Sequence, residues 1–407
     1  MKKRMLANCV SCAIGILINF SSVFGLPCVS IKCIHSRSVN KTEIVFSKLR
    51  SYSAIAVAVF LITVSIHYTF LIITASTERG NLLTRIGLLS NLIFCVRSSA
   101  AIIICICKSG YMVSHFKGFE SIRHNWKITE KEDLLELKTV RRFRKEVVHC
   151  FIIIAFLLLM YLTYLMISEF DANWNLLHKI ATILCLCVDS MLFMIHEVMA
   201  KFSTAFFSTY QKNLRNKLLD YKPISKSEML TKSGINAQNN SLRRIIVLNK
   251  RLHCALVWNV EYYNKFYDLA VLLWLITAIA LLVSNCFVLL TLWIDRNLDI
   301  PESGFIGMES QIFLTILTVT YSLYCVHKLG SVSQDTLSFL FQYPISKLNA
   351  EEAAQVETLI TVLSTKKPIL NGMDIFIYDV SLLASITGTV LTYVLVAFQF
   401  SASWVKQ

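Results

Sequence analysis

The chain has 407 residues, of which 55% are hydrophobic and only 16% charged, and its formal net charge is +14. This balance is far more apolar than that of soluble domains, so it argues against a soluble enzyme or binding module. The positive charge does not indicate a nucleic-acid partner, because nearly all of it lies in alternate segments between apolar runs.

The first 51 residues contain an apolar run, about 5–29, with basic residues on both sides. A spanning helix would leave one basic cluster outside, and Gly25 and Pro27 interrupt the run near its end. We therefore predict a cytoplasmic N-terminal segment, 1–51, with an interfacial or re-entrant helix. A cleaved signal peptide is the alternative, but cleavage would place 32–50 outside, against the charge distribution.

Seven further apolar runs are about long enough to cross a bilayer as helices. They lie at about 52–75, 86–107, 147–168, 178–200, 266–294, 310–327 and 378–403. With the amino terminus in the cytoplasm, the inward segments hold 34 of the 40 Lys and Arg residues. Because positive loops face the cytoplasm, we predict an all-α membrane protein with seven transmembrane helices, a cytoplasmic amino terminus and an extracellular carboxyl terminus.

Two charges lie deepest in these runs, Arg97 in the second and Asp189 in the fourth. A charge at the centre of a bilayer costs about 2.5–3.5 kcal/mol on insertion scales, and pairing offsets that cost. We predict that the two lie at one depth and either pair or share a polar pocket. A register-holding ion pair and a ligand-binding role are both compatible with this placement.

Aromatic and polar residues in the outer halves of the spans are candidates to line a pocket for a small ligand. Packing and interfacial anchoring are the simpler roles for each one singly. The candidates beside Arg97 and Asp189 are His67, Tyr68, Tyr161, Tyr164, Trp174, Asn285, Trp293 and Gln311.

Metal, cofactor and catalytic signatures are not found in the sequence. The cysteine pairs, such as Cys185-x-Cys187, lie in apolar helices, where cysteine behaves as a small buried hydrophobe. His196-Glu197 begins like a zinc-protease motif, but Ala200 occupies the position of the second histidine. We predict no metal, no cofactor and no enzymatic activity.

The inward segment 201–265 is predicted to extend the fourth and fifth helices into the cytoplasm. Its turn-forming residues predict interruptions near Pro223 and Ser233-Gly234. The inward segment 108–146 is interpreted as a basic loop leading to the third span.

The inward segment 328–374 contains a clearer helix. Asn349 and Glu352 have the spacing of a partial capping box. Apolar residues then recur at helical spacing, at Val356, Leu359, Ile360 and Leu363. An amphipathic helix needs a partner for this stripe, and packing within the same subunit is one solution.

The last run has a polar stripe, although Val380 to Val405 contains no formal charge. Ser385, Thr392 and Gln399 are seven residues apart, and Thr389, Val396 and Ser403 form the adjoining row. Polar groups in a spanning helix are costly unless they face protein or water. The stripe therefore predicts either a wet path or contacts between helices.

The same helix carries a sequence signature. Thr392-Tyr393, five hydrophobic residues and Gln399-Phe400 resemble the motif that closes insect gustatory receptors, chemosensory members of the seven-helix insect receptor superfamily. Gly372, Phe376 and Asp379, followed by Leu382-Leu383, are similar to the family's approach to that helix. A weaker similarity lies at 24–27.

The resemblance implies a ligand-gated, non-selective cation channel in the plasma membrane, built as a homo- or heterotetramer and opened by a small extracellular tastant. It implies an outward-facing pocket within 52–327, a cytoplasmic anchor at 328–377 and a pore-lining final helix at 378–407. It assigns the constriction to Gln399 and Phe400. Because Val394, not an acid, follows Tyr393, the resemblance favours a bitter or other non-sugar ligand.

Two other classes compete with this interpretation. A G-protein-coupled receptor has the same helix count but usually the opposite orientation. A secondary transporter would normally show internal repeats and broken helices near the bilayer midplane.

Overall fold

Six of the described helices are long and apolar enough to cross a membrane. The computed structural model describes residues 10–24, 26, 29–35, 40–75, 82–130, 145, 147–149, 152, 176–221, 232–294, 302–348 and 350–404. The six helices are α3 (Lys48–Ala75), α4 (Leu82–Cys107), α7 (Leu176–Asp220), α8 (Lys232–Ile294), α9 (Glu302–Gln342) and α11 (Ser381–Trp404). They coincide with six of the seven predicted runs, which confirms a multi-pass helical protein. The remaining run, 147–168, falls almost wholly outside the described residues.

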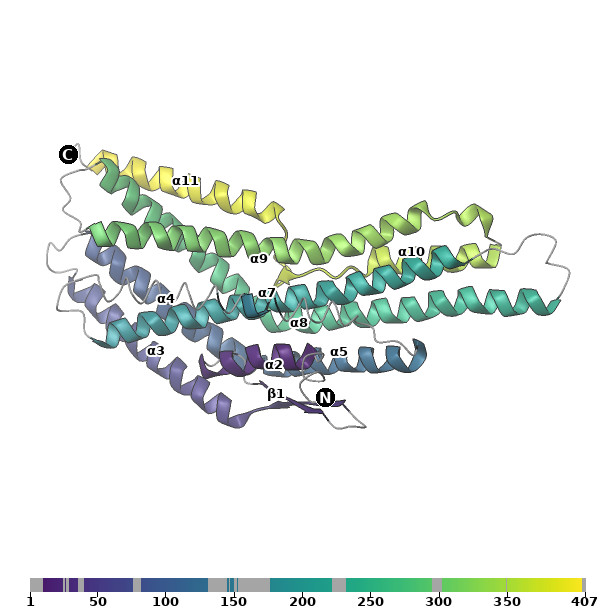
Figure 1. Cartoon of the computed structure of the whole chain (residues 1–407). Helices are drawn as coiled ribbons and strands as arrows, with labels where there is room; N and C mark the ends of the chain where they lie inside the picture. The colour runs from purple at the N-terminus through teal and green to yellow at the C-terminus, as the bar shows by residue number, and fades with distance from the viewer. Residues whose placement is uncertain are drawn as a thin grey trace.

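Three of these helices are much longer than a bilayer requires. α7, α8 and α9 have 45, 63 and 41 residues, or about 60–95 Å at 1.5 Å per residue. They run through most of the molecule side by side (Figure 1). α7 and α8 therefore continue beyond their predicted spans into 201–265, as the sequence predicted; their placement in the cytoplasm stays a prediction.

The interruption predicted at Ser233-Gly234 is wrong, because α8 begins at Lys232 and continues through both residues. A lone glycine costs a helix only about 1 kcal/mol, which so long a helix tolerates. Pro223 lies outside the described residues.

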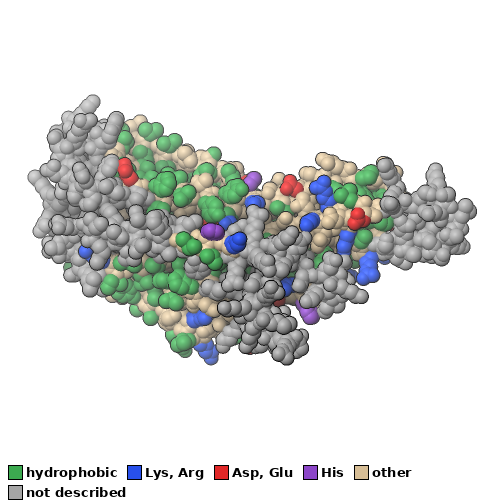
Figure 2. Space-filling model, viewed as in Figure 1, with side chains coloured by type: hydrophobic (Ala, Val, Ile, Leu, Met, Phe, Trp, Pro, Cys, Tyr) green, Lys and Arg blue, Asp and Glu red, His purple; other side chains and the backbone are tan. Residues whose placement is uncertain are grey.

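The two ends of the bundle differ in surface character. Figure 2 shows hydrophobic side chains gathered over the half that holds α3, α4 and α11, whereas Lys and Arg side chains gather toward the half that holds α10. The membrane-spanning part and the projecting helix ends are thus separated along the bundle axis.

The projecting part contains a helix that sequence reasoning treated as loop. α5 (Ser109–Glu130) follows α4 almost directly and buries Met112, Phe116 and Phe119 against the core. These residues recur every three or four positions, as in an amphipathic helix. The basic residues between them obscured the pattern.

The N-terminal segment is also more structured than predicted. α2 (Val10–Ser21) and a 3-10 turn, η1 (Ser22–Phe24), precede two antiparallel strands, β1 (Val29–His35) and β2 (Asn40–Phe46). The all-α prediction therefore holds for the bundle, but it missed this hairpin, whose strands are rich in the β-branched residues Val and Ile.

The helix predicted in 328–374 is present as α10 (Ala350–Thr365), after the 3-10 turn η3 (Ile345–Lys347). Val356, Leu359 and Leu363 are buried, and α10 contacts α8 and α9 of the same chain. The apolar stripe thus has a partner within the subunit. The cap residue Asn349 lies outside the described residues.

The hydrophobic core centres on α7. Its apolar part is 78% buried, far more than any other candidate span, and all ten residues from Met191 to Ala200 are buried. α7 contacts α2, α3, α4, α8 and α9, so it is a central element of the packed core.

Candidate functional site

The start of α11 is fixed by a tight turn that contains the upstream motif residues. β3 (Asn371–Gly372) and β4 (Phe376–Ile377) form a minimal hairpin, with Met373 and Asp374 at positive φ between them. A Cβ on Gly372 would lie 2.6 Å from the Phe376 ring. A side chain at position 372 would therefore have to displace the Phe376 ring, which covers the backbone here.

This turn is attached to α8. The Asn371 backbone N–H donates to Asn264 Oδ1 at 3.0 Å, and Asn264 Nδ2 donates to Asn371 Oδ1. Tyr378, the next aromatic residue, is buried, and its ring packs edge-on against Phe376 and His196. Burial raises the pKa of the Tyr378 hydroxyl, so this side chain stays neutral.

α11 itself is the least covered helix among the candidate spans. Only 6% of the residues in its apolar part are buried, against 78% in α7. It contacts α8 and α9 through a face that includes the buried Ile386. Leu391, Tyr393 and Leu395 are each about 60% exposed.

The predicted polar stripe lies on the uncovered side of α11. Ser385, Thr392 and Gln399 are exposed, and at about 100° per residue they lie roughly 100–140° around the helix from Ile386. The Thr392 hydroxyl donates to the Gly388 carbonyl at 2.8 Å. Val396 is 40% exposed, whereas the side chains of Phe400 and Ser403 lie outside the described residues.

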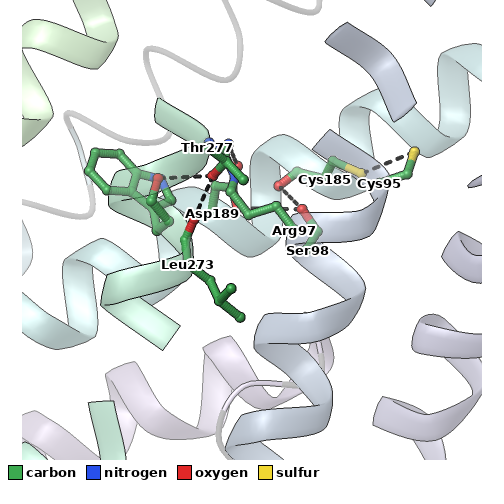
Figure 3. A network of polar contacts seen from close by, with 8 residues as sticks. Cys95, Arg97, Ser98, Cys185, Asp189, Leu273 and Thr277 are labelled. Carbon is green, nitrogen blue, oxygen red and sulfur yellow. Dashed lines mark hydrogen bonds and ion pairs between the residues drawn. The ribbon is translucent and has the colours of Figure 1, made fainter. Parts of the chain in front are cut away.

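Arg97 on α4 and Asp189 on α7 form a buried ion pair, as the sequence predicted. Their side chains are only 5% and 10% exposed, and Ser98 Oγ lies 3.4 Å from the Asp189 carboxylate (Figure 3). The Arg97 guanidinium also lies 4.6 Å from the Phe94 ring centre and 5.8 Å from that of Trp274 on α8. The cluster therefore joins three helices.

The same cluster includes two thiols. Cys95 and Cys185 are buried free cysteines whose Sγ atoms lie 3.7 Å apart (Figure 3). They fill the contact between α4 and α7 beside the ion pair. Their position agrees with the interpretation of the cysteines as small buried hydrophobes.

The other ligand-binding candidates are spread over several helices. His67 and Tyr68 lie on α3, with Tyr68 fully buried, and Asn285 is buried on α8. Trp293 and Gln311 lie in α8 and α9, but their side chains are outside the described part, as are Tyr161, Tyr164 and Trp174 altogether. Their roles as ligand contacts stay predictions.

Sequence reasoning missed a second buried cluster, of histidine and aromatic side chains, where α5, α7 and α8 meet. His115 on α5 and His196 on α7 each pack beside Tyr263 of α8. His115 Nδ1 lies 2.7 Å from the Asn259 carbonyl, and burial lowers the pKa of His115 to about 4. The helical spacing of His115 with Met112, Phe116 and Phe119 was the one signal that could have placed it in the core.

These observations define a polytopic helical membrane protein with an uncovered, polar-striped final helix. A comparison with family models matches residues 14–403 to the 7tm chemosensory receptor family. The chain therefore belongs to the 7tm chemosensory receptor family.

The fold is similar to that of solved structures of an insect receptor. The olfactory receptor OR5 from Machilis hrabei, in complex with eugenol, aligns with a TM-score of 0.64 at 14% identity, covering 95% of this chain and 97% of that one. The structure of OR5 alone gives a TM-score of 0.63 at the same identity and coverage. A comparison with curated proteins returns no match.

Proposed function

We propose that the protein is a gustatory receptor that acts as a ligand-gated, non-selective cation channel. The observation that carries the proposal is α11. Its polar stripe and its large apolar side chains are both exposed in one subunit. The polar stripe does not suit lipid, because serine, threonine and glutamine are costly in hydrocarbon.

Assembly around a shared axis satisfies both surfaces at once. Copies of α11 that place Ser385, Thr392 and Gln399 toward the axis form a wet path. Leu391 and Leu395, farther around the helix, then pack against neighbouring subunits or lipid. The threonine hydroxyls already donate to carbonyls of the previous turn, so their lone pairs remain available to water and cations. A homo- or heterotetramer is the assembly that the gustatory-type motif implies.

The charge distribution supports the proposed orientation. Lys and Arg gather toward the projecting half of the bundle, as expected for segments that stay in the cytoplasm. With that orientation the amino terminus is cytoplasmic, α2 lies at the inner membrane surface, and the carboxyl terminus at Gln407 is extracellular. The proposed location is the plasma membrane, where an outward pocket meets external ligands.

The proposed gate is at the outer end of α11. Rings of Phe400 close the path by excluding water, and spreading of the helices replaces them with Gln399 amides and Ser403 hydroxyls. α11 carries no acid in its helical part, so a wet neck lined by neutral groups discriminates poorly among cations.

The proposed ligand site is the outer bundle around Arg97, Asp189 and Trp274. A small tastant there contacts α4, α7 and α8 together. The related OR5 structure was solved with eugenol, a small organic ligand, which supports a small-molecule site in this fold. A taste role, as distinct from smell, rests on the Thr392-Tyr393 to Gln399-Phe400 motif.

Heterologous expression with a panel of sugars and alkaloids tests the proposal by recording calcium entry and single openings without G-protein signalling. Gln399→Ala and Phe400→Ala should alter conductance or leak while surface expression persists. Thr392→Ala should alter conductance, whereas its matched control Thr387→Ala should not. Thr387 has a similar hydroxyl-to-carbonyl bond, but it lies on the other side of the helix.

The alternatives give different outcomes in the same experiment. A carboxyl-terminal tag hidden from extracellular antibody would indicate the topology of a G-protein-coupled receptor. Ligand-dependent currents without resolvable unitary openings would indicate a transporter. Currents unchanged in both Gln399→Ala and Phe400→Ala would remove the assigned gate.

A further inference from the structure

An ion pair joins α9 to the first residues of the final helix. His327 Nδ1 on α9 lies 2.5 Å from Asp379 Oδ1, just before α11. The two side chains are 50% and 42% exposed, so water and protons reach both. This contact and the buried packing of Ile386 are separate attachments of α11 to the rest of the chain.

Asp379 also holds the first turn of α11 in its helical conformation. Its Oδ1 accepts the Val380 N–H at 2.6 Å, and its carbonyl accepts the Leu382 N–H at 3.0 Å. A carboxylate at this end is favourable because the helix N-terminus carries partial positive charge. A change in the position or charge of Asp379 therefore alters the hydrogen bonding of the first turn of the proposed pore helix.

The carboxylate does not change charge near neutral pH. The hydrogen bond from His327 is the main cause that lowers the pKa of Asp379 below its ordinary value of 3.8. Its stabilising effect is therefore complete above that value, and it is lost only in strong acid. An imidazole, in contrast, gains and loses its charge between about pH 5 and 8.

Other ionisable groups lie on the helices that carry the pair or pack against it. On α9, Lys328 and Tyr324 neighbour His327 in the chain and are exposed. On α7, Lys201 donates to Tyr321, and Glu197 interacts electrostatically with Lys201. On α8, Asp268 is paired with Lys108, and Tyr378 beside Asp379 stays neutral. His327 is the one histidine in this group.

We propose that His327 and Asp379 are a positioning pair whose strength depends on the charge of His327, so that channel opening responds to pH at the cytoplasmic face. The inference rests on the proposed function and orientation, which place this junction at the inner end of the pore helix. Protonation of His327 makes both partners of this hydrogen bond charged, which strengthens the contact, and it holds the start of α11 more firmly against α9.

Inside-out patches test the inference by stepping the cytoplasmic pH from 8 to 6 at fixed ligand. The open–closed equilibrium of the wild type should shift roughly two- to fivefold, the range that exposed ion pairs supply. His327→Lys should give the wild-type pH 6 behaviour at both values. His327→Gln should give the pH 8 behaviour at both, and His124→Gln, an exposed histidine on α5, should respond like the wild type.

A second readout is independent of channel activity. Hydrogen exchange of the amides from Val380 to Leu383, corrected for intrinsic rates, should slow at pH 6 relative to pH 8 in purified wild type but not in His327→Gln. Currents with no pH response, or a response retained in His327→Gln, would overturn the positioning pair and leave the proposed function standing. If no ligand evokes current, the proposed function fails. In that case, hydrogen-exchange rates with the same pH dependence in His327→Gln and wild type overturn this inference as well.

Discussion

The buried ion pair between Arg97 and Asp189 gives the sharpest energetic prediction. The Asp189→Asn change keeps the shape of the side chain but leaves the Arg97 guanidinium, 5% exposed in its side chain, without a counter-charge. Removal of one partner of a buried pair typically costs 3–5 kcal/mol, because the remaining charge has lost its water and its ion. At about 1.4 kcal/mol per tenfold, the folded population relative to the unfolded one falls by roughly two to four orders of magnitude.

Thermal unfolding in detergent, followed by size-exclusion chromatography, measures this loss. Arg97→Gln alone should be similarly destabilising, while Arg97→Gln combined with Asp189→Asn should recover most of the stability because no charge is left buried. Lys108→Gln is the control, since its partner Asp268 belongs to a more exposed pair, and it should cost less than about 1 kcal/mol. Additive losses in the double variant would refute the reasoning, because they would show that the two charges are not coupled.

Two further predictions concern the turn before α11 and the buried histidine of α5. Gly372→Ala should destabilise the turn before α11 by about 1–3 kcal/mol in thermal unfolding. Phe376→Leu should relieve the clash, because it removes the ring that lies 2.6 Å from the new Cβ. An equal loss of stability from Gly372→Ala with and without Phe376→Leu would contradict this. His115 has a pKa lowered to about 4 from 6.5, so the neutral form is the one the fold accepts: its contribution to stability is complete above pH 6.5 and declines as pH falls toward 4, by about 3 kcal/mol in all. His115→Gln should flatten that part of the stability profile, and an unchanged slope would show that other groups cause it.

The bundle was predictable from sequence because membrane helices have a strong and simple signature. Runs of about 20 apolar residues predicted α3, α4, α8 and α11 within a few residues at their membrane ends. The pairing of Arg97 with Asp189 was predictable for the same reason, since two charges at similar depth have few alternatives in hydrocarbon.

The projecting part of the bundle was harder to predict because water satisfies polar groups there and the apolar pattern is diluted. α5 was interpreted as a loop although Met112, Phe116 and Phe119 form one buried face. α10 was predicted because Asn349 and Glu352 have the spacing of a partial capping box and the four apolar residues after them recur at helical spacing. The hairpins were missed because short strands give weak period-two patterns, and the attachment of Asn371 to Asn264 joins residues too distant in sequence for any local pattern to reveal.

One helix links the parts of the molecule that the proposed function requires to be coupled. Three residues of α8 make these links. Trp274 lies beside the Arg97 guanidinium, and Tyr263 packs against both His115 and His196. Asn264 is hydrogen-bonded to Asn371 in the turn before α11. Trp274 and Asn264 are ten residues apart, or about 15 Å along a continuous helix. The helix has no break between them, and two hydrogen bonds join Asn264 to Asn371 at the turn before α11. In the proposed function, this continuous connection carries a shift at Trp274 to the start of α11. On that proposal, a ligand that binds more tightly to the shifted position of α8 biases the proposed pore helix, as a population shift requires.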